Sequence, residues 1–135
     1  NVGVINLWDL RRGHLIADLV NKGHVGAIHS LKFRSNWFHI ISGGVDHNVI
    51  VWDIRKTSKL ADLPIHKGLI TGIELMDNDM TLVTSSYDGN VIVSECDSWK
   101  QLKKFESIDK IMDISCHEHD IISVGWAGDV KLYSI

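Results

Sequence analysis

DHNVIVWD, at residues 46–53, and DGNVIVSE, at residues 88–95, decide the fold of this chain. The two stretches begin 42 residues apart and share an Asp followed by Asn-Val-Ile-Val, but only the first ends in Trp-Asp. A β-branched run that follows a polar turn is typical of a buried β-strand. Its repetition at a fixed distance indicates tandem copies of one structural unit.

Two further strand endings extend this repeat. When Trp8, Trp52, Ser94 and Tyr133 are taken as equivalent, successive copies are 44, 42 and 39 residues apart. Propeller blades of four strands repeat with a period of about 40–45 residues. Each period contains apolar runs of period two, separated by Gly, Asn and Asp, and no segment has a convincing helical periodicity. The sequence therefore predicts an all-β chain of antiparallel four-stranded units.

Three motifs resemble the repeats of WD40 β-propellers: GHVGAI (23–28), SGGVDH (42–47) and VWD (51–53). The resemblance covers almost the whole chain and implies one partial β-propeller domain, residues 1–135, within a larger ring. Residues 1–20 would end one blade, 24–63 and 66–105 would be complete blades, and 107–135 would be a final blade without its outer strand. We expect Asn1 to be an arbitrary start and residue 135 to lie near the natural end of a longer chain.

The same resemblance implies a buried hydrogen-bonded tetrad in a blade. In the first complete blade it would consist of His24, Ser42, Asp46 and Trp52. The second keeps His66, Thr84 and Asp88 but has Ser94 in place of the Trp, and the last keeps only Ser123, with Ser107, Ala127 and Tyr133 in the other places. A buried Asp is tolerable only when its oxygens are paired, so we expect these residues to be structural and not catalytic.

Composition limits the classes of function. The chain has 135 residues, of which 44% are hydrophobic, and a net charge of −3. No apolar run approaches the ~18 residues of a membrane span, and no stretch has a signal-peptide layout, so we expect neither membrane association nor secretion. The two cysteines, Cys96 and Cys116, favour a reducing compartment over a disulfide framework. The acidic balance gives no general attraction to nucleic acid.

Two short motifs carry alternative interpretations. Cys116-His117-Glu118-His119 is either a solvated turn or a partial metal site, although a zinc site needs about four converging ligands. Arg11-Arg12 is either a solvated bend or a phosphate contact. No nucleophile elbow or Gly-rich phosphate loop is present, so we expect no enzyme and no cofactor. A metal-dependent hydrolase that uses Cys116, His117 and His119 remains the third alternative.

Candidate partner-binding positions follow from the register of the blades. The residue before the turn Asp, and the residue at the entry to the first strand, would face the narrow side of a propeller. The positions are Val45, Tyr87 and Trp126 in the first group and Ala27, Leu69 and Lys110 in the second. Exposed aromatic residues are good interface anchors, so Tyr87 and Trp126 are predicted to bind a partner. The alternative is that Trp126 packs against its own loop.

The predicted function is a non-catalytic protein-binding scaffold with partners in a multi-subunit complex. The segments 64–75, 96–107 and 123–135 resemble the C-terminal part of a WD-repeat component of the spliceosomal U4/U6 snRNP. That resemblance implies a nuclear protein of pre-mRNA splicing, with splicing factors as partners and indirect or weak RNA contact. The alternative is an adaptor of another nuclear or cytoplasmic complex: a ubiquitin-ligase substrate receptor, a chromatin complex or a trafficking complex. The remaining blades of the longer chain would be further partners.

Overall fold

A computed structural model describes residues 3–19 and 23–135, which form β-strands and no helix, so the all-β prediction is confirmed. Asn1 and Val20, which the sequence assigns to the first partial blade, lie outside the described residues. The strands are β1 (Ile5–Asp9), β2 (His14–Leu19), β3 (Ile28–Phe33), β4 (His39–Gly44), β5 (Val49–Asp53), β6 (Ser58–Leu63), β7 (Ile70–Met76), β8 (Thr81–Ser86), β9 (Asn90–Glu95), β10 (Gln101–Glu106), β11 (Ile111–His117), β12 (Asp120–Gly125) and β13 (Val130–Ser134).

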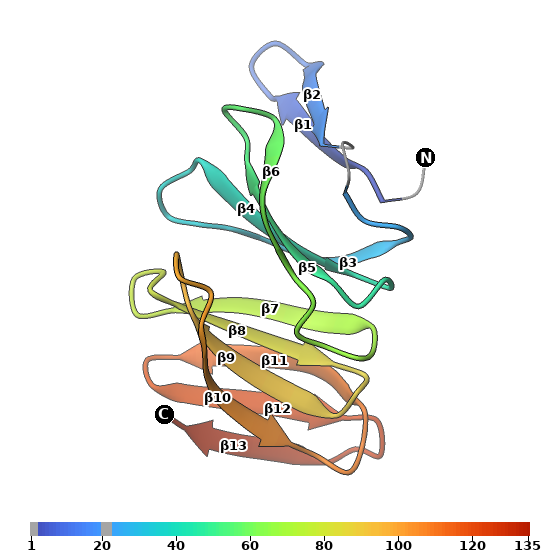
Figure 1. Cartoon of the computed structure of the whole chain (residues 1–135), viewed down its shortest axis with the longest axis vertical. Helices are drawn as coiled ribbons and strands as arrows, with labels where there is room; N and C mark the ends of the chain where they lie inside the picture. The colour runs from blue at the N-terminus through green and yellow to red at the C-terminus, as the bar shows by residue number, and fades with distance from the viewer. Residues whose placement is uncertain (1–2, 20–22) are drawn as a thin grey trace.

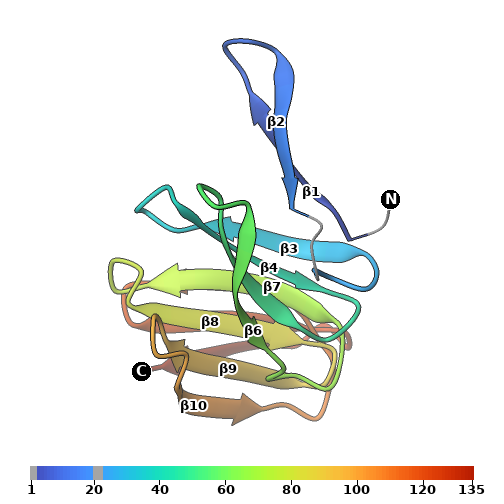
Figure 2. The ribbon, with the colours of Figure 1, turned by 45° about the horizontal axis from the view of Figure 1, so that its top comes forward.

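The strands form four antiparallel sheets in which every neighbour in the sheet is also a neighbour in the sequence. A hairpin, β1-β2, is followed by the sheets β3-β4-β5-β6, β7-β8-β9-β10 and β11-β12-β13. Figure 1 shows these sheets one after another along the long axis, with the hairpin at one end and β11–β13 at the other. Figure 2, from a second direction, shows the hairpin tilted away from the β3–β6 sheet.

Irregularities in the strands recur at equivalent places. The pairing of the first strand with the second shifts by one residue at His29, Thr71 and Met112 in the three later sheets. The pairing of the third strand with the fourth shifts at Ile16, Leu60 and Leu102. A β-bulge inserts one extra residue and bends its strand. Because bulges recur in the same register, the copies share their detailed backbone geometry as well as their spacing.

The hydrophobic core lies between consecutive sheets. Trp52, Ile40 and Ile50 pack with Ile5 and Leu19 between the hairpin and the β3–β6 sheet. The opposite face of the same strands packs against the next sheet through Ile41, Val49, Val51, Leu63, Ile70, Ile73, Leu82 and Cys96. A third cluster joins β7–β10 to β11–β13 through Met76, Val83, Val91, Val93, Ile111, Ile114 and Ile121. Sheets covered on both faces need strands that are apolar throughout, which explains Asn-Val-Ile-Val.

The last sheet is covered on one face only by the described residues. Its middle strand β12 alternates, with Ile121 and Ser123 buried and Ile122 and Val124 exposed. Leu132 of β13 is 64% exposed. The described residues contain no helix with the length and apolar character that a membrane span requires.

Candidate partner-binding surface

The first tetrad is a continuous chain of hydrogen bonds. His24 contacts Asp46 through Nδ1 at 2.9 Å and Ser42 Oγ through Nε2 at 2.7 Å. The indole Nε1–H of Trp52 donates to the same Ser42 oxygen at 2.8 Å, and the backbone amide of Val25 donates to Asp46 at 2.8 Å. The structure therefore brings together the loop before β3 with β4, the β4–β5 turn and β5.

The direction of each hydrogen bond follows from the groups involved. An ionised Asp46 only accepts, so Nδ1 of His24 carries a proton and donates to it. In a neutral imidazole Nε2 then accepts, so the Ser42 hydroxyl donates to His24 and accepts from Trp52. Both imidazole nitrogens, the Ser42 hydroxyl and the indole N–H are thereby paired.

Ser42, His24 and Asp46 have the connectivity of a catalytic triad, but not its accessibility. Ser42 and Trp52 are fully buried, and the His24 side chain is 0% exposed. The Ser42 oxygen also accepts the indole N–H, which lowers its capacity to act as a nucleophile. Ser42 therefore has no surface that a substrate could contact. The contacts join the four residues that the sequence assigns to a structural network.

The second network lacks its last member. His66 contacts Asp88 through Nδ1 at 3.0 Å and Thr84 Oγ1 through Nε2 at 2.8 Å. The backbone amide of Lys67 donates to Asp88 at 2.8 Å, as Val25 does to Asp46. Ser94, at the position of Trp52, is 1% exposed, and its hydroxyl has no hydrogen-bond partner among the described residues.

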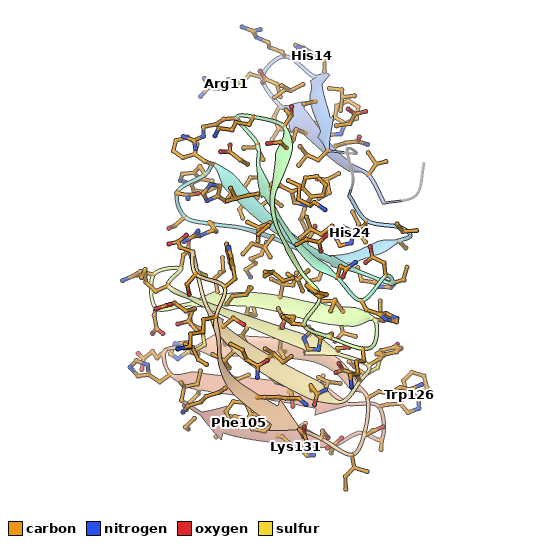
Figure 3. The ribbon with its side chains drawn as sticks, in the orientation of Figure 1. Arg11, His14, His24, Phe105, Trp126 and Lys131 are labelled. Carbon is orange, nitrogen blue, oxygen red and sulfur yellow. The ribbon has the colours of Figure 1, made fainter. Side chains whose placement is uncertain are left out.

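A different polar set occupies the last sheet. Nζ of Lys131 donates to Ser107 Oγ at 2.7 Å and lies 3.4 Å from Asp129. Figure 3 shows Lys131 close to Phe105, whose ring stacks on Tyr133 at 4.6 Å. The sequence predicts the loss of the His-based network here, but not its replacement by a lysine.

Burial determines the protonation of the second network. Burial, the largest effect, lowers the pKa of His66 from 6.5 and outweighs Asp88, which raises it. Burial, the largest single effect, raises the pKa of Asp88. Hydrogen bonds from the amides of Lys67 and Asn90 and from His66 together outweigh burial, so the pKa lies below its usual value of 3.8. The folded protein thus favours a neutral imidazole beside a carboxylate.

We expect the free energy of unfolding to fall as the pH drops below 6.5, because the unfolded chain binds a proton at His66 that the folded chain resists. The contribution is complete above the unfolded pKa and is lost as the pH falls toward the lower folded pKa. Asp88 acts in the same direction at lower pH, below about 4. Urea denaturation of the intact protein and of His66→Gln, between about pH 7.5 and 5, measures how the free energy of unfolding depends on pH. An equal pH dependence in the two proteins would contradict this assignment.

The predicted partner-binding residues occupy equivalent places in three sheets. The amide of Val45 donates to the carbonyl of Ala27, that of Tyr87 to Leu69, and that of Trp126 to Lys110, each at 2.9 Å. These bonds tie each turn between the second and third strands to the loop that enters the first strand. Val45, Leu69, Tyr87, Lys110 and Trp126 are referred to as the rim surface.

Side chains of the rim surface differ in exposure. Trp126 is 67% exposed and Val45 is 38% exposed, whereas Tyr87 and Leu69 are half-buried. Nζ of Lys110 lies over the ring of Tyr87, 5.4 Å from its centroid, within the range of a cation–π contact. Figure 3 shows Trp126 projecting from the side of the molecule on which His24 lies. The sequence places Lys110 beside Trp126, and the structure adds its contact with Tyr87.

A contact that the sequence does not reveal joins two sheets on the opposite side. Arg34, 7% exposed, donates to Asp97 at 2.7 Å and to the carbonyl of Asp79 at 3.2 Å. The Arg34 hydrogen bond lowers the pKa of Asp97. Lys32 and Glu74, on adjacent first strands, form an ion pair at 2.7 Å. These contacts fix the β3–β6 sheet against the β7–β10 sheet.

The alternative motifs lie in turns. His117, Glu118 and His119 are exposed at the β11–β12 turn. Burial raises the pKa of the Cys116 thiol to about 12, and this opposes the thiolate form that binds a metal. Among the described residues, no three His, Cys, Asp or Glu side chains converge as a metal site. The amides of Arg11 and Arg12 donate to Asp9, as in a solvated turn.

The chain is similar to several WD-repeat proteins, although no family model matches it. The WD repeat-containing protein RUP1 of Arabidopsis thaliana is 31% identical over 102 residues, which are 74% of this chain and 26% of RUP1. The DDB1- and CUL4-associated factor 10 of Xenopus tropicalis is 32% identical over 75 residues, 55% of this chain and 16% of that protein. The U3 snoRNP-associated protein-like EMB2271 of Arabidopsis thaliana is 22% identical over 152 residues, 98% of this chain and 32% of its own length.

The chain thus spans about a third or less of the length of these relatives. Its stacked antiparallel sheets, their recurring bulges and the WD-repeat relatives together identify its fold as that of WD40 β-propeller blades.

Proposed function

We propose that the chain is part of a non-catalytic scaffold that binds protein partners through the rim surface. The observation that carries the proposal is the equivalence of Val45, Tyr87 and Trp126. All three occupy the same turn position, and each is tied by its backbone to the neighbouring loop. The histidines and aspartates of the tetrad and of the second network form hydrogen bonds within the sheets, so these side chains serve the fold.

Rigid display is the mechanism that this geometry supports. The backbone hydrogen bonds at Tyr87 and Trp126 hold both turns before any partner arrives. A preorganised surface loses little conformational entropy on binding, so a modest number of contacts gives useful affinity. An exposed Trp then adds a large contact area at a low entropic cost.

The complex that we propose is nuclear and contains several proteins. One relative is named as a DDB1- and CUL4-associated factor and another as associated with the U3 snoRNP. The first name supports an adaptor of a ubiquitin ligase, and this is the assembly that we favour. The U4/U6 snRNP assignment stays a prediction, without support from the relatives named here.

A neighbouring blade from the remainder of the protein is a further proposed partner. The exposed apolar residues Ile122, Val124 and Leu132 on the last sheet support it. These side chains match the kind that the other sheets bury against one another.

Purification of the intact protein from its own cells separates the assemblies. Recovery of DDB1 and CUL4 would support the ligase adaptor, whereas recovery of U4 and U6 RNA would support the splicing assignment.

Replacement of Tyr87 and Trp126 by Ala in the intact protein is expected to weaken partner binding by at least about tenfold, since interface aromatics contribute 1–2 kcal/mol or more each. The free energy of unfolding should change much less than for a fully buried aromatic residue, because Trp126 is mostly exposed and Tyr87 is half-buried. The partner is first identified by a photo-crosslinker at position 126, then purified, and its affinity is measured by calorimetry.

Trp37→Ala is the matched control, because Trp37 is 72% exposed but lies in the turn between β3 and β4, away from the rim surface. It should leave the affinity unchanged, and a crosslinker at position 37 should not capture the same partner. Unchanged affinity per folded molecule in the Tyr87 and Trp126 variant would refute the proposed function.

A further inference from the structure

The carboxylates near the rim surface are engaged with their own loops. Asp46 and Asp88 accept hydrogen bonds from the tetrad histidines and from the amides of Val25 and Lys67. Asp109 accepts from the amides of Lys110 and Ala127, and Asp129 lies 3.4 Å from Nζ of Lys131. These four negative charges are therefore partly neutralised by groups of the same molecule.

The lysines near the rim surface are in the opposite situation. Lys67 and Lys110 are exposed in consecutive loops, which precede β7 and β11. The ion pairs found among the lysines of residues 3–19 and 23–135 belong to others: Lys32, Lys59, Lys104 and Lys131. Nζ of Lys110 lies over the ring of Tyr87 and forms no ion pair with the part of the chain that the structure describes. The positive charge of this surface thus remains available to a ligand although the chain as a whole has a net charge of −3.

An apolar anchor lies beside these charges. The amide of Trp126 donates to the carbonyl of Lys110, so the exposed indole and the ammonium group come from adjacent backbones. Ile108, in the same loop as Lys110, is fully exposed. A ligand that pairs with both lysines would therefore pass over an aromatic and aliphatic surface.

We propose that the rim surface binds an acidic, extended segment of a protein partner. Its carboxylates pair with Lys67 and Lys110, and an apolar side chain between them packs on Trp126 and Tyr87. This inference rests on the proposed function and specifies the chemistry of the partner.

Carboxylates fit this site better than phosphates do. The rim loops, residues 23–27, 45–48, 64–69, 87–90, 107–110 and 126–129, contain no arginine. Bidentate recognition of phosphate relies mainly on the arginine fork, whereas a lysine acts as a point charge. Two lysines beside an apolar anchor also provide too few phosphate contacts for nucleic acid, which binds through many.

The test uses the intact protein and three fluorescent probes. One is a short peptide with Asp and Glu on both sides of a central Leu, the second has Asn and Gln in their places, and the third is a single-stranded RNA of similar negative charge. Fluorescence anisotropy at low and high salt measures binding. The acidic peptide should bind best, and salt should weaken its binding, because exposed charge pairs are screened.

Lys67→Gln combined with Lys110→Gln should weaken the binding of the acidic peptide by about tenfold, because two exposed charge pairs are lost. Lys56→Gln combined with Lys103→Gln is the matched control, since both residues are exposed, Lys56 in the β5–β6 turn and Lys103 on β10. The control should leave binding unchanged.

Three results would overturn the inference: equal binding of the neutral peptide, tighter binding of the RNA, or no effect of the Lys67 and Lys110 changes. If the crosslinked partner depends on Tyr87 and Trp126 but not on the two lysines, the acidic chemistry is wrong and the proposed function stands. If it depends on neither pair, both fail.

Discussion

Trp52→Ala is expected to lower the free energy of unfolding of the intact protein by about 3–5 kcal/mol, the range for a buried Trp replaced by a small residue. Trp52 is fully buried and packs with Ile5, Leu19, Ile40 and Ile50 between two sheets. The substitution leaves a cavity between the sheets and removes the indole donor from Ser42. Chemical denaturation followed by circular dichroism measures the loss.

Two controls separate the contributions of Trp52. Trp52→Phe keeps an aromatic ring but removes the N–H, so it should cost less, with about 1 kcal/mol due to the hydrogen bond. Trp126→Ala makes the same change at a residue that is 67% exposed and should cost less than about 1 kcal/mol. A loss below about 1 kcal/mol for Trp52→Ala would show that the ring does not hold the two sheets together.

Asp46→Ala has the second largest expected effect, a loss of about 3 kcal/mol. The Asp46 side chain is 9% exposed and accepts from His24 and from the amides of Val25 and Asn48. Its removal leaves the proton on Nδ1 of His24 without an acceptor in a buried place. Denaturation in urea measures the change.

Asp46→Asn provides the comparison, because an amide retains one acceptor oxygen of nearly the same shape. We expect it to cost about half as much as Asp46→Ala, since the charge assistance is lost but a hydrogen bond remains. Equal losses in the two variants would mean that the carboxylate acts through something other than these hydrogen bonds.

The repeated parts of the fold could be predicted from the sequence. Strands β4, β8, β10 and β12 coincide with the runs HIISGG, TLVTSS, QLKKFE and DIISVG, because Gly, Asn and Asp mark many of the turns around them. The contacts of His24 and His66 follow from motif positions that recur 42 residues apart. Repetition supplies the information: two copies of one pattern specify one geometry.

Features that occur once could not be predicted in this way. Arg34 and Asp97 are 63 residues apart in the sequence, and nothing in their neighbourhoods repeats. Lys131 occupies the position at which Ile50 and Ile92 are buried in the other sheets. It pairs with Ser107, which occupies the position of the histidine in those sheets. Such contacts depend on how neighbouring sheets meet, which local patterns do not encode.

The rim surface could be predicted from the sequence in part. The register of the blades places Val45, Tyr87 and Trp126 at the same turn position, as their backbone hydrogen bonds show. Their exposure depends on the neighbouring loop, however. The ring of Tyr87 is half-buried beneath Lys110, whereas Trp126 remains exposed.

The most direct test measures partner affinity and the free energy of unfolding on the same samples of intact protein. It shows whether separate residues are responsible for binding and for folding. Trp52→Phe and Asp46→Asn should lower stability and leave the affinity of the folded molecules unchanged. Tyr87→Ala and Trp126→Ala should lower the affinity and leave the stability nearly unchanged. The opposite result would contradict this account: fully folded Trp52→Phe and Asp46→Asn proteins that lose affinity, and rim variants that keep it. It would mean that the tetrad takes part in recognition and that the rim surface does not.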